Sequence, residues 1–136
     1  MLQKAWREHG RLTAAFNIDN VFNFFVTAYH IRDYIRETHA VPQATLDAFV
    51  GDQDICDARD LCDKGKHLHL TRRTYPDPSA TRRVLGALNT VPLITLPLNG
   101  SMVTWVMQSG ARTVDVAALA ERVIQKWEAF FVANGL

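Results

Sequence analysis

The sequence predicts a mainly α-helical domain, a bundle of about four helices with an antiparallel β-hairpin inserted before the C-terminal helix. Three observations support this fold class. Apolar residues recur at three- and four-residue steps in residues 20–37 and 115–133, which is typical of amphipathic helices. Two apolar runs flank the dipeptide Asn99-Gly100, which is typical of a two-residue hairpin turn. The length of 136 residues fits a single domain, residues 1–136.

Four helices are expected in the first half of the chain, over residues 2–16, 20–37, 42–49 and 52–64. Asn17 and Asp19 can cap the second helix, and Asp52 can cap the fourth. The second helix is apolar almost all round in its first half, so we expect it to be central and buried. In the fourth helix, Gly65 is the expected stop. The spacing places its apolar residues inward and four aspartates outward, namely Asp54, Asp57, Asp60 and Asp63.

Strands are expected in the second half. Residues 66–70 alternate polar and apolar side chains, and residues 92–98 and 101–108 flank the Asn-Gly turn. Ser109-Gly110 is a candidate second turn, and residues 82–88 are a candidate short strand. The last helix covers residues 115–133, with Gly135 as its stop.

Composition excludes several classes of protein. The net charge of +1 and the pI of about 7.9 argue against a constitutive, sequence-independent nucleic-acid binder. No apolar stretch is long enough for a membrane helix, and the charged N-terminal residues do not resemble a secretory signal. Cys56 and Cys62 lie too far apart on one helix for a disulfide. Two free thiols and no signal indicate a reducing cytoplasm.

Charge is unevenly distributed along the chain. Residues 41–65 carry two basic and six acidic side chains, whereas residues 66–85 carry five basic and one acidic. The acidic part is expected to be a solvated helix face. The basic part is either a solvated loop or a small patch for an anionic ligand.

Several catalytic signatures are absent from the sequence. It contains no phosphate-binding GxxxxGK[ST] loop, no GxGxxG, and no HExxH, CxxC or GxSxG. These absences remove the common routes to a nucleoside triphosphatase, a dehydrogenase, a zinc protease or an α/β-hydrolase. We expect no cofactor.

The first candidate site is His30 with Asp33. Their i,i+3 spacing makes them neighbours on the surface of the second helix. A carboxylate beside an imidazole can fix its tautomer and raise its pKa, as general acid–base catalysis requires. The alternative is a half-buried histidine that Asp33 satisfies at the rim of the bundle.

The second candidate site surrounds the end of the fourth helix. Arg59 and Lys66 can hold a phosphate there, and His67 can transfer a proton. The alternative is that these residues only cap and solvate a helix C-terminus. His67 and His69 would point the same way on a strand, but two histidines without a spaced third ligand are a weak metal signal, so we expect no metal. Cys62 is expected to be a small core residue.

Two segments resemble a known group of proteins. Residues 25–35, with Tyr29-His30 and Asp33-Tyr34, and residues 59–67, with Arg59-Asp60 and Lys66-His67, resemble a group of small bacterial proteins of unassigned function. In that group an aromatic-His-x-x-Asp-aromatic helix precedes an Arg-Asp…Lys-His segment. The resemblance covers most of residues 20–131 and implies a fold without an activity.

A weaker resemblance is to the HEPN superfamily, helical domains that include RNA-cleaving toxins and act as dimers. Its members carry an arginine followed, after four to six residues, by a histidine. Seven residues separate Arg59 from His67, whereas six separate Arg32 from His39. The resemblance implies a metal-independent endoribonuclease or a nucleotide-binding domain, with RNA or a nucleotide as ligand.

The alternative function is a non-catalytic homodimeric interaction protein. Trp105, Phe130 and Phe131 exceed what one hairpin and one helix can easily cover, so we expect part of this surface to form a two-fold contact. The least favoured hypothesis is a metal-dependent hydrolase that uses His67, His69 and an aspartate.

Overall fold

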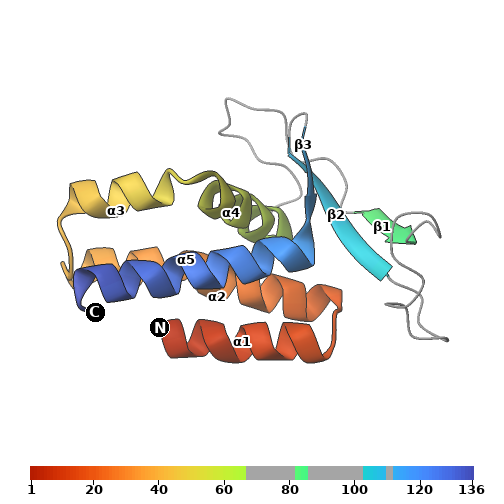
Figure 1. Ribbon diagram of the computed structural model, residues 1–136, viewed down its shortest axis with the longest axis horizontal. Helices are drawn as coiled ribbons and strands as arrows, with labels where there is room; N and C mark the ends of the chain where they lie inside the picture. The colour runs from red at the N-terminus through yellow and green to blue at the C-terminus, as the bar shows by residue number, and fades with distance from the viewer. Residues whose placement is uncertain (67–81, 86–102, 110–111) are drawn as a thin grey trace.

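The computed structural model describes residues 1–66, 82–85, 103–109 and 112–136. Within these residues the chain forms five helices and a three-stranded antiparallel sheet. Helices α1 (Leu2–Ala14), α2 (Ile18–Glu37) and α5 (Val116–Asn134) lie lengthwise beside one another (Figure 1). Helices α3 (Gln43–Val50) and α4 (Gln53–Lys66) cover one side of them, and the sheet lies at one end. The predicted fold class is confirmed.

Helix α2 is the centre of the bundle. It packs against α1, α3, α4 and α5, which explains why its first half is apolar almost all round. Phe24, Ala28 and Ile31 have no exposed surface. They share one core with residues of the other helices, among them Leu12, Leu46, Ile55, Val123 and Trp127. Leu61, which we also expected in this core, is only partly buried against it.

Local capping sets the boundaries of the first two helices. The Asn17 side chain accepts a hydrogen bond from the backbone N–H of Asn20, 2.9 Å away, so the predicted cap of α2 is confirmed. Asn20 in turn donates its side-chain amide to the carbonyls of Arg11 and Ala15. These bonds fix the short turn between α1 and α2.

Helix α4 begins as predicted and ends later than predicted. Oδ1 of Asp52 accepts hydrogen bonds from the backbone N–H groups of Asp54 and Ile55, which caps the helix. Gly65 was expected to end α4, and this expectation is wrong, because the helix continues through it to Lys66.

The sheet has the order β1-β2-β3, with β1 Arg82–Leu85, β2 Val103–Ser109 and β3 Arg112–Asp115. Ser109 pairs with Arg112, so β2 and β3 form a hairpin just before α5 at the position of the predicted second turn, whose Gly110 lies outside the described residues. The short strand predicted over residues 82–88 is confirmed at its first four positions. The strand predicted over 66–70 is wrong at Lys66, which is the last residue of α4. The rest of that strand, the Asn99-Gly100 turn and the strand predicted over 92–98 lie outside the described residues.

Helix α5 follows β3 without a loop. Asp115 caps it by accepting a hydrogen bond from the N–H of Ala118, and Gly135 ends it in the left-handed region at φ 66°. The predicted helix 115–133 is therefore confirmed within one residue at each end. In the described part of the chain, no helix is long and apolar enough to cross a membrane.

Candidate functional site

His30 and Asp33 form a close pair on the surface of α2. Nδ1 of His30 lies 2.7 Å from Oδ2 of Asp33, and the two side chains are 40% and 32% exposed. When Nδ1 carries the proton, it donates to the carboxylate, and Nε2 becomes the basic nitrogen. The predicted contact is confirmed, and its catalytic role stays a prediction.

Two arginines of α2 approach the same carboxylate. Nη2 of Arg36 donates a 2.9 Å hydrogen bond to Oδ1 of Asp33, and Nε of Arg32 lies 3.3 Å from that oxygen without hydrogen-bond geometry. The Arg32 guanidinium also lies 4.2 Å above the centre of the Tyr29 ring. This cation–π contact and the ion pair hold Arg32 against the helix surface.

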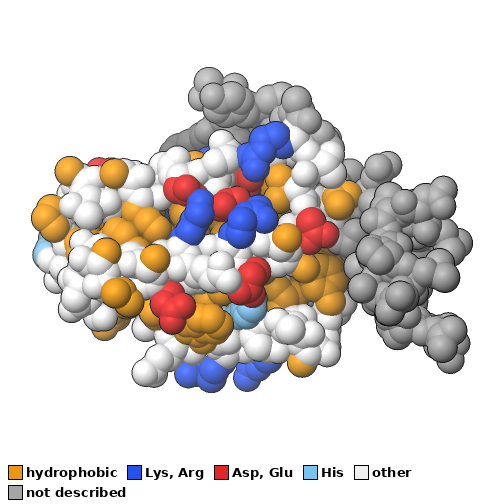
Figure 2. Space-filling model, in the orientation of Figure 1, with side chains coloured by type: hydrophobic (Ala, Val, Ile, Leu, Met, Phe, Trp, Pro, Cys, Tyr) orange, Lys and Arg blue, Asp and Glu red, His pale blue; other side chains and the backbone are white. Residues whose placement is uncertain are grey.

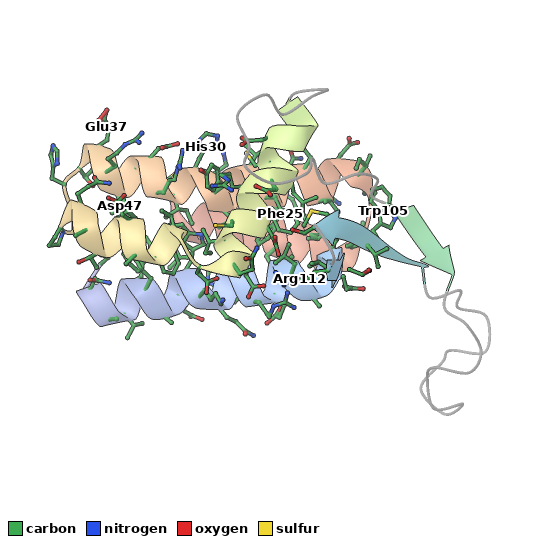
Figure 3. All side chains as sticks on the ribbon, turned by 90° about the horizontal axis from the view of Figure 1, so that it is seen from above. Phe25, His30, Glu37, Asp47, Trp105 and Arg112 are labelled. Atoms are coloured by element: carbon green, nitrogen blue, oxygen red, sulfur yellow. The ribbon has the colours of Figure 1, made fainter. Side chains whose placement is uncertain are left out.

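Helix α4 adds a second set of charges to this region. Burial raises the pKa of the Tyr29 hydroxyl, and the positive charges of Arg32 and Arg59 oppose that shift. Asp63 acts on the same hydroxyl, so α4 places both Arg59 and Asp63 within electrostatic reach of α2. Figure 3 shows His30 on α2 next to α4, on the side of α2 that faces away from α5.

We call this region the α2–α4 face. It consists of Tyr29, His30, Arg32, Asp33, Arg59 and Asp63. Arg59 is 40% exposed at its side chain, and its Nε pairs with Oδ1 of Asp60 at 3.1 Å. The face therefore presents an imidazole–carboxylate pair beside guanidinium groups, which can hold a phosphate group and move a proton.

The remaining predicted site residues lie at the end of α4. Lys66 is the last residue of that helix, and its side chain is outside what the structure describes. His67 follows directly, and both it and His69 lie outside the described residues. Of the predicted site residues, His30 and Asp33 lie on α2 and Arg59 lies on α4. These two helices pack against each other.

From the sequence we did not place Tyr29, Arg32, Arg36 and Asp63 with the His30–Asp33 pair, because we considered Arg32 only with His39 and Asp63 only as part of an acidic helix face. The signal was present in the spacing. Arg32 follows Tyr29 by three residues and Arg36 follows Asp33 by three, so each pair lies on one side of a helix. Asp63 could not be connected to α2 before the packing of α4 was known.

The acidic residues of α4 are not a solvated face, which corrects our expectation. Asp54, Asp57 and Asp60 are 9%, 0% and 7% exposed. The reason is that α4 packs on both α2 and α5, and that cations of α5 and β3 pair with its carboxylates. Arg122 of α5 binds Asp54 through Nε and Nη2, the latter at 2.9 Å.

This network stabilises the charged forms of its members. A hydrogen bond from Arg122 lowers the pKa of Asp54 below its usual value, although burial opposes the shift. Burial lowers the pKa of Lys126, but hydrogen bonds to Asp52 and Asp54 outweigh burial and raise it. Figure 2 shows these acidic and basic side chains gathered on α4 and α5. Because these charges pair with one another, the network holds α4 and α5 together.

Neither cysteine chemistry nor a metal centre is visible in the described residues. Cys56 and Cys62 are not joined by a disulfide, and Cys62 is buried, as expected for a core residue. Among the residues that the structure describes, no group of three or more His, Cys, Asp or Glu side chains could hold a metal ion.

Comparison with known proteins gives no relative. No protein-family model, curated protein or solved structure matches the chain significantly. The function must therefore be argued from the residues themselves.

Proposed function

We propose that the α2–α4 face binds an RNA phosphodiester and cleaves it without a metal ion, as an HEPN-like endoribonuclease. The observation that carries the proposal is the 2.7 Å contact between His30 and Asp33 on an imidazole that is 40% exposed at its side chain. Arg32 and Arg59 supply positive charge at the hydroxyl of the neighbouring Tyr29. An oriented, accessible imidazole can both accept and donate a proton.

The reaction needs RNA, these side chains and one further proton donor. The ribose 2′-oxygen attacks the adjacent phosphorus, and the bond from phosphorus to the 5′-oxygen breaks. The products are a 2′,3′-cyclic phosphate and a free 5′-hydroxyl. One imidazole takes the 2′-hydroxyl proton and a second proton donor protonates the leaving 5′-oxygen, while arginine stabilises the charge on the phosphate oxygens.

His30 and His67 are the two candidates for these proton transfers. Asp33 orients His30, and His67 follows the end of α4, where Arg59 and Lys66 were predicted to hold the phosphate. Binding of a nucleotide without cleavage uses the same cations and is the weaker form of the same proposal.

The non-catalytic homodimer remains the alternative, although one of the three side chains expected at its contact is buried within the chain. Phe130 is only 7% exposed and packs on Phe49 and Trp127. Trp105 packs edge-on against Phe16. Trp105 and Phe131 are only partly buried, so part of the expected contact surface stays exposed.

The test is incubation of the purified full chain with a mixed RNA pool in excess chelator. We expect cleavage products that end in a 2′,3′-cyclic phosphate, and loss of cleavage in His30→Ala and Arg59→Ala. His67→Ala decides whether that residue is the second proton-transfer group. Asp47→Asn, on exposed α3, is the matched control and should cleave normally.

Two results would contradict the proposal. Wild type that neither cleaves RNA nor binds a labelled RNA or nucleotide would leave the interaction protein as the better hypothesis. The second result is that His30→Ala still cleaves RNA whereas Arg32→Ala and His39→Asn do not. The active site would then consist of Arg32 and His39, which have the family's spacing.

A further inference from the structure

A stripe of cations runs along the outer edge of α1. Lys4, Arg7 and Arg11 are exposed and recur at three- and four-residue steps, so they share one side of that helix. Figure 2 shows Lys and Arg side chains at this edge, on the side of α1 away from α5. Arg11 binds Glu8 at 2.8 Å, whereas in the part of the chain that the structure describes Lys4 and Arg7 form no ion pair. Their charges are therefore available to an anionic ligand.

One edge of α2 lies along this side of α1. The side-chain amide of Asn20 donates to the backbone carbonyls of Arg11 and Ala15, at 3.3 and 2.7 Å, so α2 begins against the Arg11 side of α1. Thr27 and His30 follow Asn20 at helical spacing, which places them on the same edge of α2. Thr27 is buried, as expected on an edge that packs on a neighbouring helix. His30 therefore lies on the edge of α2 that is nearest to α1.

The register between the two helices places Lys4 beside His30. Helices α1 and α2 run in opposite directions (Figure 1), and the ring centres of His9 and Phe24 lie 5.5 Å apart, which aligns them. From this contact Lys4 lies ~7.5 Å along α1, and His30 lies ~9 Å along α2 in the same direction. The two residues are thus at nearly the same level. The cationic stripe extends ~10 Å from Lys4 to Arg11.

Tyr34 lies on the other side of His30 along the same edge of α2. It follows His30 by one helical turn and is 56% exposed although it is a large aromatic. An exposed aromatic ring can stack on any nucleic-acid base, and cations along a surface can follow the phosphates of the strand. We call Tyr34, Lys4, Arg7 and Arg11 the α1–α2 edge. It presents a stacking ring on one side of the imidazole and a row of cations on the other.

We propose that the α1–α2 edge binds the RNA strand on both sides of the bond that is cleaved at His30. A base on one side of that bond stacks on Tyr34, and the phosphates on the other side lie along the cationic stripe. This inference rests on the proposed function, because it follows the same RNA away from His30. Two unpaired cations and one ring provide only modest affinity, in keeping with a net charge of +1.

The experiment measures binding of a labelled 2′-O-methyl RNA strand of ~10 nucleotides, a length within the range of single-strand sites. Its blocked 2′-oxygen cannot attack phosphorus, so binding is measured separately from cleavage. Wild type should bind this strand, and log Kd should rise linearly with log salt concentration. Lys4→Gln and Arg7→Gln should each lower that slope by ~0.7, since each removes one phosphate contact. Tyr34→Ala should weaken binding ~5–150-fold, the usual effect of removing one stacking ring.

Two matched variants lie outside the α1–α2 edge. Ala44→Glu, at an exposed position of α3, lowers the net charge by one, as Lys4→Gln does, and α3 lies on the opposite side of the bundle from α1 (Figure 1). Trp6→Ala removes an exposed aromatic on the α5 side of α1, where Trp6 contacts His9. Both variants should keep the affinity and the salt slope of wild type. Circular dichroism confirms that each variant is folded.

The outcomes distinguish this inference from the proposed function. If wild type does not bind the strand, or if Lys4→Gln and Arg7→Gln keep the wild-type slope, the inference is overturned even when the protein cleaves RNA. If the slopes fall as expected but the protein does not cleave RNA, the edge stands as a strand-binding surface and the cleavage mechanism fails. Binding to vesicles that contain phosphatidylserine, without binding to the RNA strand, would also overturn the inference, because the ligand would then be a membrane surface.

Discussion

Oγ of Ser109 donates a 2.9 Å hydrogen bond to Oδ1 of Asp57, although 52 positions separate the two residues in the sequence. Gln53 donates to the same oxygen at 3.0 Å, and Nη1 of Arg112 lies 3.4 Å from Oδ2. Asp57 has no exposed surface. A buried carboxylate thus joins α4 to both strands of the β2–β3 hairpin, and Figure 3 shows Arg112 at this junction.

Asp57→Ala should strongly destabilise the protein. It removes a buried acceptor and leaves Ser109 and Arg112 without their partner, so we expect the free energy of unfolding to fall by ~3–5 kcal/mol. The measurement is urea denaturation followed by circular dichroism. Asp47→Ala, which removes an exposed aspartate on α3, should change the stability by no more than ~0.5 kcal/mol. An equal loss of stability in the two variants would show that Asp57 does not hold α4 and the β2–β3 hairpin together.

Gly10 and Gly135 should respond to alanine in opposite directions. A Cβ at Gly10 in α1 would meet nothing within 4 Å, so Gly10→Ala should stabilise the protein by up to ~1 kcal/mol through helix propensity. Gly135 has φ 66°, and Gly135→Ala should cost ~1 kcal/mol because L side chains disfavour that region. Thermal unfolding of both variants tests the pair, and a lower melting temperature for Gly10→Ala would contradict this description of α1.

Phe24→Ala should cost ~3–5 kcal/mol, the usual effect of deleting a buried aromatic ring. Phe24 has no exposed surface. The centre of its ring lies 5.0 Å from the ring centre of Phe25 and 5.5 Å from that of His9. Tyr34, on the same helix, is 56% exposed and provides the control. Guanidinium denaturation should separate the two variants clearly. A loss from Tyr34→Ala as large as that from Phe24→Ala would be inconsistent with the observed core.

Asp54 should make the stability depend on pH at the acid end. Its pKa is lowered in the folded state by Arg122, so its contribution is fully present above the unfolded value of about 3.8 and is lost as the pH falls through the folded value. Asp54→Asn should therefore lower the stability at neutral pH and flatten the fall in acid. Denaturation curves between about pH 2 and pH 7 test this against Asp47→Asn, whose curve should follow that of wild type.

The helices could be predicted from the sequence because their signals are local. Asn17, Asp52 and Asp115 were identified as caps or helix starts from residue type and position, and the structure confirms each. The burial of α2 followed from its apolar periodicity alone. Gly65 failed as a stop because glycine lowers helix propensity without forbidding a helix.

The environment of the acidic residues could not be predicted in the same way. Asp57 is buried because Ser109 and Arg112, more than fifty positions away, lie beside it in the fold. Nothing local distinguishes it from a solvated aspartate. The same holds for the candidate site. The His30–Asp33 contact could be predicted from the i,i+3 spacing, whereas the electrostatic effect of Arg59 on Tyr29 depends on how α4 packs against α2.

The central claim is that His30 transfers a proton during RNA cleavage, and the most direct test is one ratio of rates. The initial rate of cleavage of a single labelled RNA, in excess chelator, is measured for wild type and for His30→Ala. If His30 acts as a general acid–base, the rate of the variant should be ~10²–10⁴-fold lower than that of wild type. The circular dichroism spectrum should be unchanged, because the His30 side chain is 40% exposed. Equal rates for the two proteins would contradict the claim.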